Sequence, residues 1–319
     1  MAGVTPRELG RSGIAVSNLA LGSWRTFERI PRETGVAVMR AAMEAGIDFL
    51  DDARYNDETG TAPIPTGYSE IVFGELFKQA GWRRDEVVVA NKLWWEFWPE
   101  QDAEAEVDGS LGRMGLEHLD LVYAERPPEG LGMEELVREV GGIIRKGKVR
   151  AWGVLNWSPD QILEAARVAD AEGVPPACCA QLAYSVAMRS PVEDPAMVDA
   201  LRFTGVTVVA SFSMMGGVLS GKYLGAGTEG RWSKELDDPR LATAKVAAVA
   251  LQHLAVKAHT TAAALAIAFP LFNPRVSSVL FGATSAGQVE ANRQALELIA
   301  GLDERATAEL LGIGAPPRK

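Results

Sequence analysis

Cysteine and histidine are both scarce in this chain, and their scarcity excludes several kinds of site. The 319 residues include two cysteines and three histidines. Cys178 and Cys179 are adjacent in an apolar run, where neighbouring strand side chains point to opposite faces. We therefore expect two buried thiols, no disulfide, and a cytoplasmic location. No Cys/His cluster has metal-ligand spacing, and no histidine ends a strand, so neither a metal site nor a serine nucleophile is predicted.

Positive net charge and long apolar runs are also missing. The formal net charge is −10, which argues against nucleic acid or an anionic membrane as the main partner. No window approaches 18 uninterrupted apolar residues, so no membrane span is predicted. The opening residues, MAGVTPRELGRSG, lack an apolar core, so no secretory signal is expected. These absences leave a small-molecule substrate as the expected partner, and they give no prediction of oligomeric state.

The chain does contain a repeated unit, in which a short β-like run precedes an amphipathic helix-like run. The expected strands cover residues 15–23, 49–53, 87–93, 119–125, 149–156, 177–185, 206–213 and 276–283. The expected helices cover residues 34–45, 69–80, 102–114, 133–145, 160–170, 194–203, 242–257 and 286–299. Eight such pairs predict a single α/β domain over residues 1–319, a (β/α)8 TIM barrel.

Two further features bear on this architecture. A turn at residues 11–13 separates two short β-like pieces, which predicts an N-terminal β-hairpin closing the barrel floor. An open doubly wound sheet is the competing layout, but the first strand runs into LGSW and lacks the G-x-G-x-x-G turn typical of that fold. The longest irregular segments, residues 56–66 and 224–239, are expected on the side of the barrel where the strands end.

Polar side chains occur where three consecutive strands end. Asp51 ends the second strand, Lys92 the third and Glu125 the fourth, and Tyr55 follows Asp51 closely. Strand ends converge on one mouth of a barrel, and an ammonium beside a phenol is expected to lower the phenol pKa. This set predicts a general acid for a developing alkoxide or enolate. The alternative is that Asp51 and Lys92 form a buried ion pair with a purely structural role.

Other residues near strand ends allow both functional and structural interpretations. Asn156 is either a ligand or a turn residue, and Gln181 is either a ligand or a satisfied core amide. Four aromatic residues follow the third strand, namely Trp94, Trp95, Phe97 and Trp98. We expect some of them to line a cleft for an apolar substrate, because four aromatics in five positions exceed what inward packing uses.

A family resemblance emerges from these segments taken together. The segments that show it are RELGRSGIAVSNLALGSW, GIDFLDDA, VVVANKLW, VRAWGVLNWS, QLAY, ASFSMMGGVLSGKY and FGATSAGQVEAN. In this order and at barrel spacing, they resemble the aldo/keto reductase superfamily over nearly the whole chain. The resemblance implies that Asp51 and Lys92 are catalytic. It also implies an NADPH-type cofactor bound without a Rossmann domain, and hydride transfer to a carbonyl.

The resemblance also implies where the cofactor binds. The matching positions are Gly22, Ser23, Trp24, Asn156, Gln181, Ser211, Phe212, Ser213, Met214, Gly216, Lys222, Gly282, Ala283, Thr284, Gln288 and Asn292. Asn156 and Gln181 match ligands of the nicotinamide amide. Residues 283–288 contain no basic side chain for a 2′-phosphate, and Arg293 is the nearest cation. A helix N-terminus holds phosphate without arginine, so NADPH is expected, with NADH tolerated.

The proton donor departs from the family pattern. The family tyrosine lies five residues after the aspartate, whereas Tyr55 lies four residues after Asp51. An apparent insertion, residues 57–66, then precedes Tyr68. Tyr55 is the first choice for the acid, and Tyr68 is the second, because the insertion allows Tyr68 to reach the mouth.

Two departures affect the nucleotide contacts. Ser211 occupies the position of the aromatic residue that stacks on the nicotinamide, and Phe212 replaces it only if the strand bulges. Leu155 replaces the serine of a Ser-Asn pair. These changes affect the expected rate and the expected binding of the nucleotide. Ser211, the altered tyrosine spacing and the replacement of the family histidine by Glu125 keep open a nucleotide-binding regulatory barrel with little turnover.

Glu125 replaces the catalytic histidine of the family. In a dry pocket a glutamic acid stays protonated and donates a hydrogen bond to a substrate carbonyl. Steroid 5β-reductases, one branch of this family, have a glutamate here and reduce C=C bonds. A guanidinium of Arg126 folded back onto Glu125 would instead keep it ionised. Carbonyl reduction is therefore the expected reaction, and reduction of an enone C=C bond is the alternative.

Overall fold

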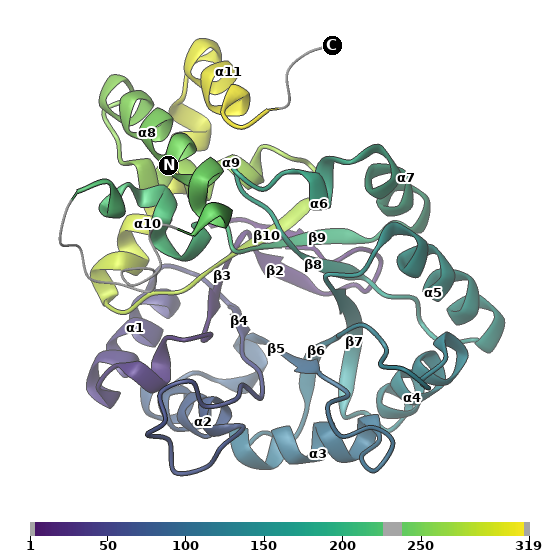
Figure 1. Ribbon diagram of the computed structural model, residues 1–319. Helices are drawn as coiled ribbons and strands as arrows, with labels where there is room; N and C mark the ends of the chain where they lie inside the picture. The colour runs from purple at the N-terminus through teal and green to yellow at the C-terminus, as the bar shows by residue number, and fades with distance from the viewer. Residues whose placement is uncertain (1–3, 226–237, 316–319) are drawn as a thin grey trace.

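The computed structural model describes residues 4–225 and 238–315. Eight parallel strands close into a barrel in the order β10-β3-β4-β5-β6-β7-β8-β9, with helices around it (Figure 1). The strands are β3 (Leu19–Gly22), β4 (Phe49–Asp51), β5 (Val88–Leu93), β6 (Leu119–Ala124), β7 (Val149–Leu155), β8 (Cys179–Ala183), β9 (Thr207–Ser211) and β10 (Val276–Phe281). The predicted (β/α)8 barrel is confirmed, and the doubly wound alternative is excluded.

The eight predicted helices are present among the described residues, whereas the helices Ser190–Glu193, Ala262–Leu271 and Glu304–Gly312 were not predicted. The helices are α1 (Arg32–Glu44), α2 (Tyr68–Ala80), α3 (Ala103–Met114), α4 (Met133–Arg145), α5 (Pro159–Glu172), α6 (Ser190–Glu193), α7 (Pro195–Thr204), α8 (Ala242–Lys257), α9 (Ala262–Leu271), α10 (Ala286–Gly301) and α11 (Glu304–Gly312). Within the described part of the chain, no single helix is long and apolar enough to cross a membrane. Only α8 and α9 taken together pass that test, by length and composition alone, and they are bent by 101°.

A two-stranded hairpin covers the end of the barrel where the strands begin. β1 (Pro6–Glu8) pairs antiparallel with β2 (Ala15–Ser17). The Gly10 N–H donates to Thr207 Oγ1 at 3.0 Å, and Arg7 Nη1 donates to the Val276 carbonyl at 2.6 Å. Thr207 and Val276 are the first residues of β9 and β10, so the predicted closure of the floor is confirmed.

The first predicted strand, residues 15–23, is in fact two strands. Residues 15–17 belong to the hairpin and residues 19–22 belong to the barrel. Asn18 lies between them, where its N–H donates to the Thr5 carbonyl at 3.1 Å and its Nδ2 donates to Thr5 Oγ1 at 3.1 Å. These bonds hold the chain at the point where it changes sheet, which alternation of side chains alone did not indicate.

The barrel lumen is filled by side chains from both the hairpin and the strands. Its apolar cluster includes Leu9, Ile14, Val16, Phe49, Leu121, Tyr123, Cys178, Cys179 and Val209. A larger apolar cluster lies between the strands and the helices. Both cysteines are free and buried, as predicted. Burying each large apolar side chain contributes about 1.5–3 kcal/mol, so this packing fixes the strands that carry the polar residues.

The insertion after β4 forms a closed loop at the strand-end side of the barrel. Asn56 and Thr66 form an isolated antiparallel bridge, so the loop starts and ends at one place. Inside it, Asp57 accepts from the Thr59 N–H at 2.8 Å. Glu58 forms ion pairs with Arg25 and Arg29, which follow β3. The other predicted irregular segment, residues 224–239, lies largely outside the described residues.

Candidate active site

The centre of the mouth is a buried ion pair between neighbouring strands. Asp51 is the last residue of β4 and pairs in register with Ala90 of β5, two residues before Lys92. Lys92 Nζ donates to Asp51 Oδ1 at 2.6 Å and to the Asp52 carbonyl at 3.1 Å. Both side chains are almost fully buried. The sequence therefore brings these two charges together where they are screened little by water.

Tyr55 is the tyrosine that lies beside this ion pair. Lys92 Nζ is 5.7 Å from the centroid of the Tyr55 ring, and the Trp94 ring lies 6.1 Å from it on centroids. The Gly67 N–H donates to the Tyr55 carbonyl at 2.9 Å, so the end of the insertion fixes the backbone of Tyr55. This geometry places one phenol within reach of the lysine.

Tyr68 is directed elsewhere. It is the first residue of α2, and its hydroxyl accepts from Arg32 Nη2 at 2.9 Å. The Arg32 guanidinium also lies 5.6 Å from the centroid of the Tyr68 ring. Arg32 is the first residue of α1, so Tyr68 contacts the helix layer rather than Lys92.

The pKa of Tyr55 differs from the expectation. Burial raises it well above the usual value, and the negative charges of Asp51, Asp52, Glu28 and Glu70 raise it further. The expectation that Lys92 lowers the pKa of this phenol is therefore wrong for this arrangement. One ammonium is already neutralised by Asp51 at 2.6 Å, so burial and the surrounding carboxylates dominate.

Asp52 is a buried carboxyl group that the sequence did not single out. It is fully buried, and its Oδ1 accepts a hydrogen bond from the Ser23 hydroxyl. Its Oδ2 has no partner among the described residues. Burial, followed by the charge of Glu70, raises the pKa of Asp52 well above its usual range. The sequence Asp51-Asp52 could have indicated this residue. Side chains alternate along a strand, so only one of the two aspartates can face the lumen and the other must be buried on the opposite face.

Replacing Asp52 with asparagine is expected to raise the free energy of unfolding at neutral pH by about 1–3 kcal/mol, because an amide carries no charge to desolvate. The pKa of Asp52 is higher in the folded protein than in the unfolded chain. Asp52 therefore contributes fully to stability below its unfolded pKa of about 3.9, and this contribution is lost as the pH rises through the folded pKa. Urea unfolding of both proteins should therefore show a larger gain at about pH 8 than at about pH 5.

Asp57→Asn is the matched control for this measurement. Asp57 is half-buried, and hydrogen bonds from Thr59 lower its pKa, so it contributes stability above its unfolded pKa. Its replacement should therefore lower the stability by a similar amount at both pH values, opposite in sign to Asp52→Asn. An equal gain from Asp52→Asn at both pH values would show that Asp52 does not carry the desolvation cost.

Glu125 directly follows β6 at the mouth and is half-buried. Its Oε1 accepts from the Arg126 N–H at 3.0 Å, and its carbonyl accepts from Trp95 Nε1 at 3.3 Å. The Arg126 guanidinium donates to the Asn156 carbonyl, with Nε at 2.8 Å. Arg126 therefore does not fold back onto the Glu125 carboxyl group.

Two residues complete the floor beneath Lys92. Gln181 donates from Nε2 to Asp51 Oδ2 at 2.9 Å, which matches the structural interpretation of a satisfied amide. Tyr123 pairs in register with Lys92, and its ring centroid lies 5.8 Å from Lys92 Nζ. A Cβ added to Gly153 would lie 2.6 Å from the Cys179 carbonyl oxygen and 3.2 Å from the Tyr123 ring, so close packing against both residues requires a glycine here.

The sequence missed Tyr123, although a signal was available. Tyr123 lies on β6 and Glu125 directly follows it, two residues later, so alternation directs both side chains to the same face. Burial raises the pKa of the Tyr123 phenol well above the usual value. This phenol therefore stays protonated beneath the ammonium.

The four aromatic residues after β5 divide between the mouth and the core. Trp94 is half-buried beside Tyr55, and Phe97 is 46% exposed. Trp95 is buried and contacts Trp98 edge-on at 6.2 Å between centroids. Trp24, after β3, is 39% exposed. Three aromatic side chains at strand ends are thus accessible, as expected for an apolar wall.

The remaining nucleotide positions lie on the same end of the barrel. Asn156 is exposed and has a left-handed φ of 53°. Ser211 ends β9, on the strand face that Val209 presents to the lumen. β9 keeps an unbroken register with β8 through Ser211, and Phe212 packs on the outer apolar cluster. The bulge that would let Phe212 replace the missing aromatic is therefore absent from this pairing.

Glycines and hydroxyl groups occur along two of the segments predicted to bind the nucleotide, residues 211–222 and 282–292, where small side chains leave the backbone accessible. Gly216 and Gly217 have φ values of 64° and 92°, and a Cβ added to Gly282 would lie 3.0 Å from Thr26 Oγ1. Ser285 caps α10, and Gln288 Oε1 accepts from the Thr284 N–H at 2.8 Å. The other predicted positions differ in exposure. Three of them are buried, namely Ser213, Ala283 and Asn292, whereas Met214 is half-buried and Lys222 is exposed. These donors and open backbones suit the phosphates of a dinucleotide.

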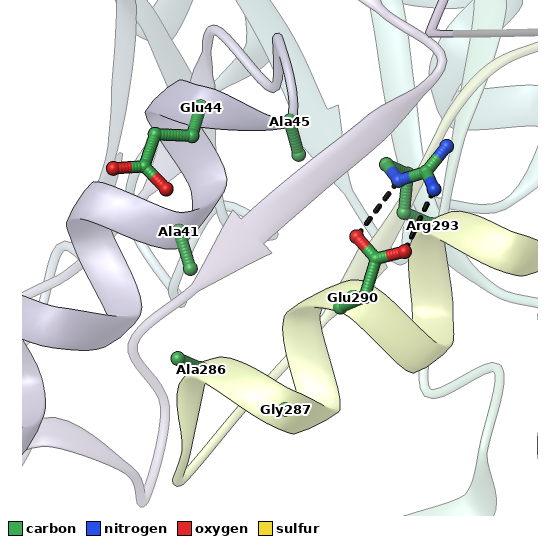
Figure 2. A pocket seen from close by; sticks show the side chains of 7 residues that line it. All are labelled: Ala41, Glu44, Ala45, Ala286, Gly287, Glu290 and Arg293. Carbon is green, nitrogen blue, oxygen red and sulfur yellow. Dashed lines mark hydrogen bonds and ion pairs between the residues drawn. The ribbon is translucent and has the colours of Figure 1, made fainter.

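Arg293 does not belong to that set of donors. A groove of about 520 Å³ lies between α1 and α10, and Figure 2 shows Arg293 beside it. Its Nη2 contacts Glu290 Oε1 at 2.7 Å, and its Nη1 contacts Glu297 Oε1 at 3.2 Å. The two glutamates raise the pKa of Arg293 and engage its charge. The groove is lined by helix residues and by none of the strand-end side chains.

Comparisons with known proteins agree with this geometry. A family model described as "Aldo/keto reductase family" matches residues 18–311. One relative, "Probable voltage-gated potassium channel subunit beta" from Oryza sativa subsp. japonica, is 31% identical over 308 residues. That alignment covers 92% of this chain and 91% of the relative. The chain belongs to the aldo/keto reductase family, whose members are oxidoreductases that generally use NADP(H).

Proposed function

We propose that this protein reduces the carbonyl group of an apolar small molecule with NADPH, and that it tolerates NADH. Tyr55 is the proton donor. The observation that supports this most is the position of Lys92, held at 2.6 Å by Asp51 and 5.7 Å from the Tyr55 ring. A phenol, an ammonium and a carboxylate in this order form a general acid.

Tyr55, Lys92 and the residues proposed to hold the nucleotide each have a defined part in the proposed reaction. When bound, the nucleotide supplies the hydride, and the residues placed to hold it are those around Trp24, Asn156, Gly216 and Thr284. As the carbonyl carbon is reduced, its oxygen becomes an alkoxide, which takes the proton from the Tyr55 hydroxyl. Lys92 stabilises the phenolate that remains. The raised pKa of Tyr55 keeps the phenol protonated before each turnover, and an alkoxide is a strong enough base to remove that proton.

The accessible aromatic side chains support a bulky apolar substrate. Trp24 and Phe97 are 39% and 46% exposed, and Trp94 lies beside Tyr55. Aromatic surface at a strand-end mouth is costly to leave in water, and an apolar ligand covers it favourably. We also propose a small molecule as the main partner and the cytoplasm as the location, from the net charge of −10 and the two thiols.

Glu125 supports a second reaction on the same site. Its carboxyl group lies at the mouth, and the Arg126 guanidinium is bound to the Asn156 carbonyl instead. A protonated Glu125 would donate a hydrogen bond to the oxygen of an enone and polarise it. The β-carbon would then be the hydride acceptor, so the C=C bond would be reduced.

Oxidation of NADPH by the wild-type protein and by Glu125→Gln tests both reactions. We expect the wild type to reduce an aromatic aldehyde and a matching ketone. An amide donates a hydrogen bond to the enone oxygen as a carboxylic acid would, so Glu125→Gln should retain enone reduction if this position supplies that donor. If only the aldehyde is reduced and the enone is inert in both proteins, the role of Glu125 in C=C reduction is wrong.

A second candidate function is a nucleotide-binding subunit with little turnover. The rice relative is described as a probable potassium channel subunit, which favours this candidate, as does Ser211 at the position of the stacking aromatic. Tight NADPH binding without turnover of any carbonyl compound would support this candidate. Measurable turnover would favour the reductase.

A further inference from the structure

We propose that Glu106 is a positioning residue that shapes the substrate site for bulky apolar carbonyl compounds. Residues 94–97, which directly follow β5, form the segment called the β5 wall below. Together with Arg54, Glu106 holds every residue of this wall. This role rests on the proposed reductase function, because it assigns the substrate preference of that reaction to a buried ion pair.

The Glu106 carboxylate binds two consecutive backbone N–H groups of the β5 wall. The Trp94 N–H donates to Glu106 Oε1 at 2.9 Å, and the Trp95 N–H donates to Glu106 Oε2 at 3.1 Å. Glu106 lies on α3 and is 3% exposed, so little water competes for these bonds. With both oxygens engaged, the carboxylate fixes the direction in which the chain leaves β5.

The backbone that Glu106 holds has an uncommon conformation. Trp95 has a left-handed φ of 58°, which is sparsely populated for an aromatic residue and persists only where neighbouring contacts maintain it. At this turn the two tryptophans separate, since Trp94 is half-buried beside Tyr55 and Trp95 is buried. Without the carboxylate, the turn would relax and Trp94 would no longer be held at the mouth.

Arg54 extends the same network to the rest of the β5 wall. Its Nη2 contacts Glu106 Oε1 at 3.5 Å and Glu96 Oε2 at 3.1 Å. Its guanidinium lies 4.8 Å from the centroid of the Phe97 ring, whose residue is 46% exposed. The pair of Glu106 and Arg54 therefore contacts each of residues 94–97, through two N–H groups, a carboxylate and a ring.

Arg54 also connects this network to the proposed proton donor. It is buried and directly precedes Tyr55 in the sequence. The segment with the acid and the segment with the aromatic side chains are thus fixed to one carboxylate, which α3 supplies from outside the barrel. The separation of 6.1 Å between the centroids of the Tyr55 and Trp94 rings consequently depends on Glu106.

Glu106→Gln is the test substitution. Glutamine offers one acceptor oxygen and places an NH2 group against the second backbone N–H, so one of the two bonds is lost. Arg54 keeps Glu96 as a partner at 3.1 Å, so no buried charge is left unpaired. Glu106→Asp is a second variant that keeps the charge and shortens the side chain. It also cannot reach both N–H groups, and it carries the test if Glu106→Gln does not fold.

Glu104→Gln is the matched control. Glu104 lies on the same helix, two residues before Glu106, and forms ion pairs with Lys146 and Lys148, which follow α4. The control removes one negative charge from α3, as Glu106→Gln does, and it leaves the β5 wall in place. A general electrostatic effect would therefore appear in both variants.

We expect both Glu106 variants to raise KM for 2-naphthaldehyde about 3–10-fold, the range that corresponds to the loss of one aromatic contact. Propanal has no aromatic ring to pack on the wall, so kcat for propanal should stay within about twofold of the wild type. Glu104→Gln should change neither value by more than about twofold. A purely structural ion pair would lower the rate for both aldehydes alike.

Two further measurements need no turnover. At least one of the Trp94 and Trp95 N–H groups should exchange with solvent about 10–100-fold faster in Glu106→Gln, measured by NMR, because its bond to a charged acceptor is lost. The Kd for 2-naphthaldehyde, measured with NADP⁺ bound by quenching of tryptophan fluorescence, should rise by the same factor as KM.

Three outcomes would overturn the role of Glu106. The first is an equal loss of kcat for both aldehydes. The second is faster exchange with an unchanged Kd for 2-naphthaldehyde, which would leave Glu106 a structural residue only. The third is a wild type that does not bind 2-naphthaldehyde. If the wild type binds this aldehyde and reduces no carbonyl compound, the proposed function fails separately, and the Kd and the exchange rates still decide whether Glu106 holds the wall.

Discussion

Tyr55→Phe is expected to lower kcat for carbonyl reduction by about 10²–10⁴-fold, the usual contribution of a positioned proton donor. Phenylalanine keeps the ring that lies 5.7 Å from Lys92 Nζ and beside Trp94, and it removes only the hydroxyl group. The Kd for NADPH should therefore change little. Stopped-flow measurement of a single turnover, together with fluorescence titration of NADPH, would separate the loss in chemistry from any loss in binding.

Tyr68→Phe is the matched control for this prediction. The Tyr68 hydroxyl accepts from Arg32 Nη2 at 2.9 Å in the helix layer, so its removal should leave the rate within about twofold of the wild type. An inactive Tyr68→Phe beside a fully active Tyr55→Phe would transfer the role to Tyr68. It would also show that the insertion changes shape when the substrate binds.

The sequence alone did not decide whether Tyr55 or Tyr68 is the proton donor, because the conformation of the insertion between them could not be predicted. The bridge between Asn56 and Thr66 closes the loop on itself, so the extra residues do not displace the flanking segments. The Gly67 N–H then reaches the Tyr55 carbonyl at 2.9 Å. Whether an insertion closes in this way depends on contacts such as those of Glu58 with the segment after β3, which no local pattern specifies.

Elements with strong periodicity were predictable, and so were the residues at their ends. Asp51 and Lys92 lie on adjacent strands, and their contact follows from parallel register once both strands are identified. Contacts across the barrel were not predictable in this way. Gln181 and Asp51 are 130 residues apart and meet only because the sheet closes. The hydrogen bond between Gln181 and Asp51 was consequently not predicted from the sequence.

The error about Tyr55 has a similar origin. The expected pKa was argued from Lys92 alone, because that residue was the obvious neighbour in the predicted mouth. The closed barrel also brings Asp52, Glu28 and Glu70 near the phenol, from three different segments. Their summed negative charge and the burial of the ring exceed the effect of one ammonium already paired with Asp51. Considering only the nearest charged residue gave the wrong direction for the pKa shift of Tyr55, because the electrostatic potential at the phenol depends on all the charges of the site.

Lys92→Met is expected to abolish measurable reduction and to destabilise the protein by about 3–5 kcal/mol, because it leaves Asp51 as a buried charge without its partner. Methionine fills a similar volume, so the loss comes from charge and not from a cavity. Urea unfolding would give the change in free energy, and NADPH oxidation would give the change in rate. A fully active Lys92→Met would contradict the proposed acid.

The double variant Lys92→Met with Asp51→Asn separates the catalytic role of the pair from a structural one. The asparagine retains an acceptor for Gln181 Nε2, and the buried charge is gone, so most of the lost stability should return. Activity should not return, because no ammonium remains beside Tyr55. If restoring stability also restored the rate, the ion pair would only hold the barrel together. A stable and inactive barrel would instead show that the buried charge is retained for the chemistry of the phenol.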